Sequence, residues 1–120
     1  MEQQFSFEKL AAWQEARGLV KDIYALLAKF PHEERYALCD HIRRAVVSVP
    51  SNIAEGSGRM SKNEQRHFYE IAYGSLMETY CQLILAVDLG YLNEVEIAAI
   101  KQRIWHAAKV LSALRNSIKE

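Results

Sequence analysis

The chain has 120 residues, half of them apolar and a quarter charged, which excludes a disordered chain and fits one globular domain over residues 1–120. Its 15 basic residues equal its 15 acidic residues, so net charge alone gives no attraction to nucleic acid. Met1 to Phe7 lack the basic and apolar regions of a signal peptide, and no apolar run is long enough to span a membrane, so we expect a cytoplasmic protein.

Helical periodicity dominates the first half of the sequence. Apolar residues recur at steps of three and four over residues 7–29 and again over residues 33–56, which predicts two amphipathic helices. Pro31 ends the first, and Gly56 with Gly58 ends the second. The inward positions are Leu10, Trp13, Ala16, Val20, Ile23, Leu27 and Phe30 in the first helix, and Cys39, Ile42, Val46, Val49 and Ile53 in the second.

Two further helices follow over residues 62–89 and 94–118. Ser61 with Glu64, and Asn93 with Glu96, have the spacing of capping boxes, and Gly90 separates the two helices. The inward positions are Tyr69, Ala72, Leu76, Tyr80, Leu83 and Val87, then Ile97, Ile100, Ile104, Ala107, Leu111, Leu114 and Ile118. Because the connections are short, neighbouring helices run antiparallel, and we predict an all-α, up-down-up-down four-helix bundle.

The third helix is apolar nearly all round. Glu78 is its only formal charge between Ile71 and Val87, and several apolar residues lie off its inward face. Such a helix needs cover on a second side, which predicts a homo-oligomer. The alternative is an irregular bundle that wraps this helix with its own neighbours. The apolar residues off the inward face are Tyr73, Met77, Ile84 and Leu85.

The end of the second helix contains Pro50, which cannot donate to the carbonyl of Val46, so a kink or a substitute donor is expected. Small residues around it would let another helix approach closely. The alternative is that residues 56–61 bind an anion through backbone amides, helped by Arg59 or Lys62. Together with the third helix, this segment gives the candidate interface residues Ser48, Pro50, Ser51, Asn52, Glu55, Tyr73, Met77 and Ile84.

Basic residues are unevenly distributed. Residues 97–119 contain no acidic residue, and on a helical wheel they form an outward stripe that could follow a phosphate backbone and stack on a base. The alternative is a solvated face whose cations favour a helix C-terminus. The stripe is Lys101, Trp105, Lys109, Ser112, Asn116 and Lys119, and a second basic concentration comprises Arg43, Arg44, Arg59, Lys62 and Arg66.

The sequence contains no recognisable catalytic or metal-binding pattern. Its four histidines lack the spacing of a metal site, and neither cysteine has a nucleophile signature. Cys39 and Cys81 lie in apolar helical patterns, so we interpret both as reduced core residues. We therefore predict no enzyme, no cofactor, no metal and no small-molecule substrate.

Two stretches resemble a known family. They are Ile42 to Arg59, IRRAVVSVPSNIAEGSGR, and Gly74 to Leu92, GSLMETYCQLILAVDLGYL. Over most of its length the chain resembles the bacterial four-helix bundle proteins encoded in 23S rRNA intervening sequences. The resemblance implies a homopentameric ring of bundles without catalytic residues. A related protein, the accessory variability determinant of diversity-generating retroelements, looks like a nucleic-acid-binding partner of reverse transcriptase and is strongly basic, whereas this chain is neutral.

The resemblance also implies roles by position. It makes Arg43, Arg44 and Arg59 candidate polyanion contacts, whereas Pro50, Asn52, Glu55 and Gly56 look like structural or interface positions. The leading hypothesis is a non-enzymatic oligomeric module that binds structured RNA or DNA. The alternative is a protein-interaction scaffold, which the neutral charge and aromatics such as Trp105 and Tyr36 favour. The candidate nucleic-acid-binding residues are Arg43, Arg44, Arg59, Lys62, Arg66, Lys101, Trp105 and Lys109.

Overall fold

The computed structural model describes residues 2–119, which form four α-helices and two short 3₁₀ helices and contain no β-strand. The α-helices are α1 (Ala11–Leu27), α2 (Leu38–Ser57), α3 (Lys62–Asp88) and α4 (Glu94–Ser117). The 3₁₀ helices η1 (Ser6–Lys9) and η2 (His32–Glu34) precede α1 and α2. The predicted all-α class with four helices is confirmed. Residues 1 and 120, the two ends of the predicted domain, lie outside the described part.

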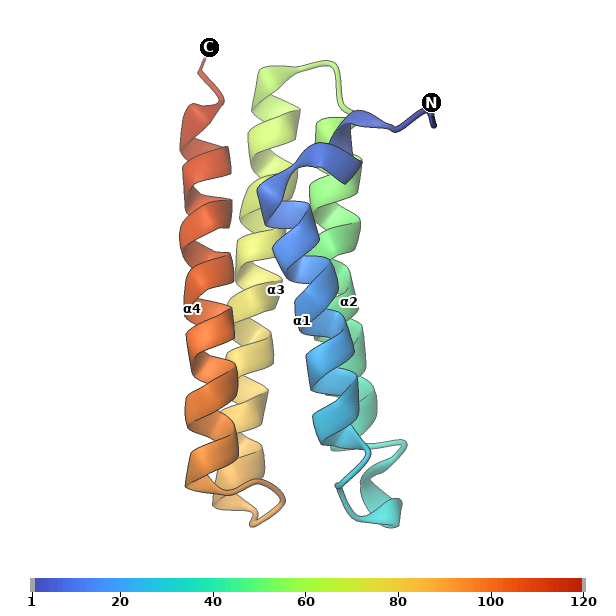
Figure 1. Ribbon diagram of the computed structural model, residues 1–120, viewed down its shortest axis with the longest axis vertical. Helices are drawn as coiled ribbons and strands as arrows, with labels where there is room; N and C mark the ends of the chain where they lie inside the picture. The colour runs from blue at the N-terminus through green and yellow to red at the C-terminus, as the bar shows by residue number, and fades with distance from the viewer. Residues whose placement is uncertain (1, 120) are drawn as a thin grey trace.

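Consecutive helices run in opposite directions along a bundle of 45 × 32 × 24 Å (Figure 1). Around the bundle, α1 contacts α2 and α4, and α3 contacts the same two helices, so α1 and α3 lie diagonally across from each other. Both ends of the chain lie at one end of the bundle. Within residues 2–119, no helix is sufficiently long and apolar to cross a membrane.

The core is built largely from the predicted apolar stripes. All five inward positions predicted for α2 are buried, as are the first five predicted for α4, while Leu114 and Ile118 are half-buried. In α3, Tyr80 and Val87 are only half-buried, and Thr79 and Ala86 are buried in their place. The Thr79 hydroxyl is satisfied there because it donates to the carbonyl of Ser75 at 2.8 Å.

The inward face of α1 differs from the prediction by one residue. Leu19 and Ala12 are buried, whereas the predicted Val20 and Trp13 are only half-buried. Trp13 packs its edge against the ring of Phe7, with 5.0 Å between ring centroids. The large indole therefore holds the N-terminal 3₁₀ segment against α1, and smaller side chains face the other helices.

The first residues of α1 and of α2 were both predicted too early in the sequence. The first helix begins at Ala11 rather than residue 7, because Leu10 is extended and η1 precedes it, and it ends at Leu27 rather than residue 29. The second begins at Leu38 rather than residue 33, after Pro31 and η2. Arg43 stabilises the connection by donating to the carbonyl of Arg35 at 2.6 Å.

Helices α2 and α3 approach closely at Gly56, which lies inside α2 and does not end it. A Cβ at this position would lie 2.8 Å from Cε1 of Tyr69 and 3.0 Å from Cβ of Phe68. The glycine is therefore required by helix packing, and the helix ends one residue after it, at Ser57, with the predicted Gly58 as its C-cap. Burial in this contact raises the pKa of the Tyr69 phenol.

The helix α2 continues through Pro50, and polar side chains nearby join it to α3. The Asn52 amide donates to the Ser48 carbonyl and hydroxyl, each at 2.8 Å. The Ser48 hydroxyl in turn lies 2.9 Å from the hydroxyl of Ser75 in α3. Small polar residues around the proline therefore bond within the bundle.

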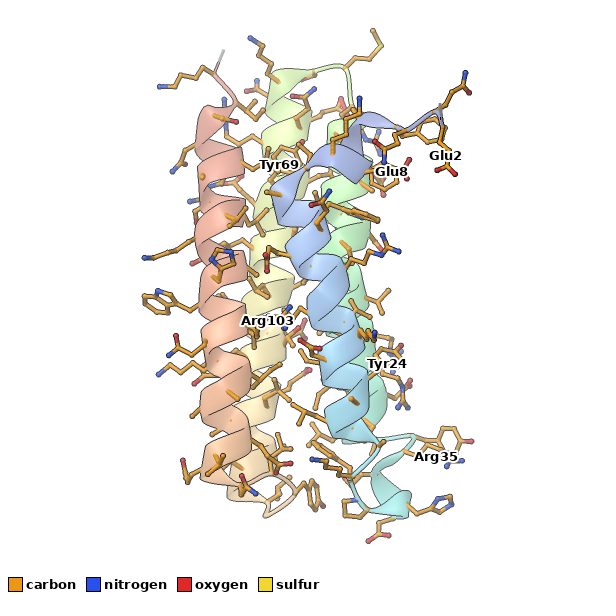
Figure 2. The ribbon with its side chains drawn as sticks, viewed as in Figure 1. Glu2, Glu8, Tyr24, Arg35, Tyr69 and Arg103 are labelled. Carbon is orange, nitrogen blue, oxygen red and sulfur yellow. The ribbon has the colours of Figure 1, made fainter. Side chains whose placement is uncertain are left out.

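The N-terminus of α4 is bonded to the residues that directly follow α1. Asn93 and Glu96 form the predicted reciprocal capping box, and the Glu96 carboxylate also accepts from Lys29 Nζ at 2.8 Å. These hydrogen bonds, first that from Lys29, lower the pKa of Glu96. Further along the same seam, Arg103 of α4 pairs with Asp22 of α1 (Figure 2). At α3 the Ser61 hydroxyl accepts from the Glu64 amide at 3.3 Å.

The two cysteines have different environments. Cys39 is buried, and burial raises the pKa of its thiol, which keeps it protonated and unreactive. Cys81 is exposed on α3, so its predicted place in the core is wrong. The apolar pattern of α3 misassigned it because that pattern continues onto the solvent face. Among residues 2–119, no three His, Cys, Asp or Glu side chains are grouped to hold a metal ion.

Candidate functional site

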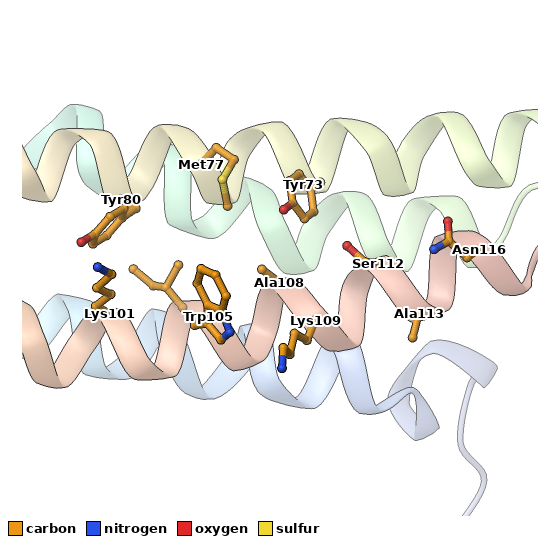
Figure 3. A pocket seen from close by; sticks show the side chains of 11 residues that line it. Tyr73, Met77, Tyr80, Lys101, Trp105, Ala108, Lys109, Ser112, Ala113 and Asn116 are labelled. Carbon is orange, nitrogen blue, oxygen red and sulfur yellow. The ribbon is translucent and has the colours of Figure 1, made fainter.

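A groove of about 450 Å³ runs between α3 and α4 on the outside of the bundle (Figure 3). Its α3 wall is formed by Tyr73, Met77 and Tyr80. On α4, Lys101 and Trp105 stand at one end, where Tyr80 faces Lys101. The remaining α4 lining comprises Ile104, Ala108, Lys109, Ser112, Ala113 and Asn116.

The side-chain sizes on the two helices explain the groove. Aromatic and methionine side chains of α3 stand opposite small residues of α4, including Ala108 and Ser112, which cannot fill the space between the helices. Ile104 closes the floor because it belongs to the buried stripe of α4. The groove is thus an apolar slot with a polar rim.

An exposed apolar surface extends from this groove over α3. Trp105 is 61 % exposed and Met77 is 39 % exposed at the groove itself. Ile84 and Leu85 continue the surface towards the end of α3 and are 42 % and 47 % exposed. Monomeric proteins rarely leave large contiguous apolar patches exposed, so a surface of this kind is suited to contact another molecule.

The rim of the groove is basic. The Lys101 ammonium lies 6.0 Å from the centre of the Tyr80 ring, and Lys109 stands level with Tyr73. The Arg115 guanidinium lies 5.4 Å from the centre of the Tyr73 ring. The predicted stripe on α4 is thereby brought together with Tyr73 and Met77, two residues predicted for the oligomer interface, so both sets of candidates share one surface.

The arginines predicted to contact a polyanion are engaged within the chain. Arg44 pairs with Asp40 at 2.9 Å, and Arg59 pairs with Glu55 at 2.6 Å. Arg59 also lies 3.6 Å from the Glu64 carboxylate and stacks on Phe68. Neighbouring carboxylates therefore offset the positive potential of Arg44 and Arg59.

Three other basic candidates are dispersed. Arg43 donates to the carbonyl of Arg35, and Arg66 donates to the carbonyl of Ile118 at 3.1 Å. Lys62 is exposed at the first position of α3. Arg43 therefore lies on a different helix from the basic rim of the groove, whereas Arg66 reaches the end of α4, two residues beyond the groove residue Asn116.

The connection between α2 and α3 uses backbone amides that an anion would need. The Gly58 amide donates to the Glu55 carbonyl and the Arg59 amide donates to the Gly56 carbonyl, both at 3.1 Å. The carboxylates of Glu55 and Glu64 lie beside Arg59. This arrangement gives no support to the anion-binding alternative for residues 56–61.

The interface candidates on α2 divide into two groups. Ser48 and Asn52 bond within the bundle, and Pro50 is half-buried beside them. Ser51 and Glu55 are exposed in a shallow cleft of about 520 Å³ on the outer side of α2. Most of the residues that line it are polar or charged, and the other lining residues are Tyr24, Asp40, Arg43, Arg44, Val47, Ser48 and Asn52.

Sequence reasoning missed Tyr80 and Ala108 as groove residues. Tyr80 was placed in the core, and Ala108 belonged to neither the inward nor the outward pattern of its helix. The signal that could have found them is the antiparallel alignment of α3 with α4. Because residues 88 and 94 flank the short connection, counting back along α3 and forward along α4 brings Tyr80 opposite Lys101 and Tyr73 opposite Lys109.

Comparison with known proteins supports the fold and the family. A solved structure of a protein of unknown function from the S23 ribosomal protein family of Bacteroides thetaiotaomicron superposes with a TM-score of 0.76. It is 18 % identical, and the match covers 88 % of this chain and 98 % of that chain, which shows a shared fold. No curated protein matches the chain. The family model for 23S rRNA-intervening sequence proteins matches residues 8–113, nearly the whole bundle, and the chain therefore belongs to this family.

Proposed function

We propose that the protein is a non-enzymatic assembly module whose copies associate through the apolar surface of α3 and the groove between α3 and α4. The observation that carries the proposal is the exposure of three large apolar side chains, Met77 and Ile84 on α3 and Trp105 across the groove on α4. Covering such side chains is favourable by about 25 cal/mol for each Å² of apolar surface removed from water. A ring of five copies, which the family resemblance implies, would cover this surface on every copy.

The neutral composition favours assembly over polyanion binding as the main role. The chain carries equal numbers of acidic and basic residues, and Arg44 and Arg59 have carboxylate partners within the chain. The groove itself is mainly apolar, which fits a protein surface better than a phosphate backbone. Assembly therefore accounts for the exposed apolar side chains of α3 and for Trp105.

The double substitution Met77→Glu with Ile84→Glu is expected to weaken self-association at least about tenfold, because each change places a charge on a surface that association would bury. The measurement is sedimentation velocity across micromolar to sub-millimolar protein. Val95→Glu is the control, since Val95 is 79 % exposed at the start of α4 outside the groove. A parent protein that sediments as a 13.8 kDa monomer throughout would contradict the proposal.

A second candidate function, binding of structured RNA or DNA, is supported by one specific observation. Lys101, Trp105 and Lys109 line the same groove, and residues 97–119 contain no acidic side chain. Two cations flanking an exposed indole could contact a phosphate backbone and stack on a base. A groove covered by another protein surface could not do so, and the two functions would then compete.

Replacing Lys101 and Lys109 with glutamine is expected to weaken binding to labelled structured RNA and to lower its salt dependence by about 1.4 to 1.8, in logarithmic slope, for two lost phosphate contacts. Fluorescence anisotropy over a range of salt concentrations measures both quantities. Arg43→Gln with Arg44→Gln is the matched variant and should change binding less, because both arginines are engaged within the chain. If the parent protein does not bind the labelled RNA even at low salt, this second function is ruled out.

A further inference from the structure

We infer that copies of this chain associate head to tail, with the outer strip of α3 in one copy lying in the α3–α4 groove of the next. The outer strip consists of Ile71, Gly74, Glu78, Cys81 and Leu85, all exposed and on the face of α3 away from the core. This inference rests on the proposed self-association and specifies its contact. Three observations carry it: charge, spacing along the helices and an unexplained glycine.

The strip and the groove carry opposite charges. From residue 67 to residue 100 the chain has acidic residues and no lysine or arginine, and Glu70, Glu78 and Asp88 lie exposed along α3. From residue 97 to residue 119 the reverse holds, with Lys101 and Lys109 on the groove. One chain thus presents an apolar helix face with acidic flanks and an apolar groove with a basic rim. This complementarity favours a second copy as the occupant.

The charges also match in position along the helices. Glu70 and Glu78 are eight residues apart, as are Lys101 and Lys109, so each pair is separated by about 12 Å along its helix. Lys101 stands level with Tyr80 and Lys109 level with Tyr73 (Figure 3). A rotation about an axis parallel to the helices preserves these heights. It would therefore bring Glu78 of one copy near Lys101 of the next, and Glu70 near Lys109.

Gly74 supports a close approach at the middle of the strip. Glycine in a helix interior is less favourable than alanine, so a contact that needs a small residue would offset this cost. A Cβ at Gly74 would meet no atom of residues 2–119 within 4 Å, so packing within one chain does not require glycine there. Cys81, two turns further on, is also small. A neighbouring copy packed against these two residues would supply the missing reason.

The strip and the groove lie on different sides of α3, so one copy can offer both at once. Such a contact is heterologous: each copy presents its strip to one neighbour and its groove to another. A rotation that closes then produces a ring, and one that does not close produces a filament. Charge reversal tests this arrangement directly, because the two partners of the contact come from different surfaces.

The experiment measures the dissociation constant of self-association by sedimentation equilibrium at low salt. Glu78→Lys and Lys101→Glu are each expected to raise it about tenfold, since each replaces an attraction by a repulsion. The double variant, Glu78→Lys with Lys101→Glu, is expected to have a dissociation constant within about threefold of that of the parent, because the two reversed charges attract each other again. Circular dichroism verifies that each variant keeps its helices.

Two variants with the same charge changes elsewhere serve as controls. Lys21→Glu lies on α1, diagonally across the bundle from α3, and Glu33→Lys lies in η2; both residues are exposed. Neither should change the dissociation constant. A parent that associates but is unaffected by either single reversal, or a double variant no better than the singles, would overturn this contact and leave the proposed self-association standing. A parent that remains monomeric would overturn both.

Discussion

Replacing Leu76 with alanine is expected to lower the free energy of unfolding by about 2–5 kcal/mol. Leu76 lies in the middle of α3 with none of its surface exposed, among the buried residues of the core. The truncation removes buried methyl groups and leaves a cavity that two neighbouring helices, each held by its own contacts, can close only in part. Urea denaturation followed by circular dichroism, at a protein concentration where the chain is monomeric, measures the loss.

The matched control is the next residue on the same helix. Met77 points into the groove and is 39 % exposed, so Met77→Ala should change monomer stability by less than about 1 kcal/mol. Equal losses at both positions would mean that the groove is closed in solution, and would contradict the exposed surface on which the assembly proposal depends. A small loss at Leu76 would contradict the position of the core.

The sequence predicted the buried stripes best where only one helix face was apolar. In α2, the five residues at steps of three and four are all buried, and an alternative stripe through Val47 would contain the polar residues Asp40 and Ser51. In α1, Leu19 and Val20 are both apolar, and the two alternative stripes differ by one residue. Helical periodicity cannot decide between them, because the choice depends on how Trp13 packs against Phe7.

Helix starts depend on contacts that a local pattern does not contain. The chain between α1 and α2 is held by the bond from Arg43 to the Arg35 carbonyl, and the start of α1 is set by η1 and the packing of Phe7. By contrast, the starts of α3 and α4 were predicted correctly. Their caps are local, since Ser61 and Asn93 each accept from an amide three residues later.

Several residues that line the groove were among the predicted candidates, but their arrangement was not predicted. A helical wheel found Lys101, Trp105 and Lys109 on one helix and Met77 on another, yet a wheel describes one helix at a time. Which of these residues line the same groove depends on how α3 and α4 are aligned with each other. The pairing of Arg44 with Asp40 and of Arg59 with Glu55 was visible, because both pairs are four residues apart in a helix. Counting charges without pairing them overstated the second basic concentration.

Replacing Gly56 with leucine is expected to lower the free energy of unfolding by about 3 kcal/mol or more. Even the first carbon of the new side chain would lie 2.8 Å from Cε1 of Tyr69 and 3.0 Å from Cβ of Phe68. The Cβ of Phe68 is fixed to the backbone of α3, so the clash can be relieved only by separating the two helices. That separation would open the contact between Ser48 and Ser75 as well.

Gly74→Leu provides the matched control, because it makes the same change in the neighbouring helix at a position where a Cβ meets no atom of residues 2–119 within 4 Å. Leucine is a better helix former than glycine, so the monomer should gain up to about 1 kcal/mol. The same variant should associate less, since leucine would block the close approach proposed for the outer strip. Urea denaturation and sedimentation of both variants separate the two effects. If Gly74→Leu lowered the free energy of unfolding, or if Gly56→Leu left it unchanged, the two glycines would not have the roles assigned to them. Gly56 would then not be required by packing within the bundle, or Gly74 would be.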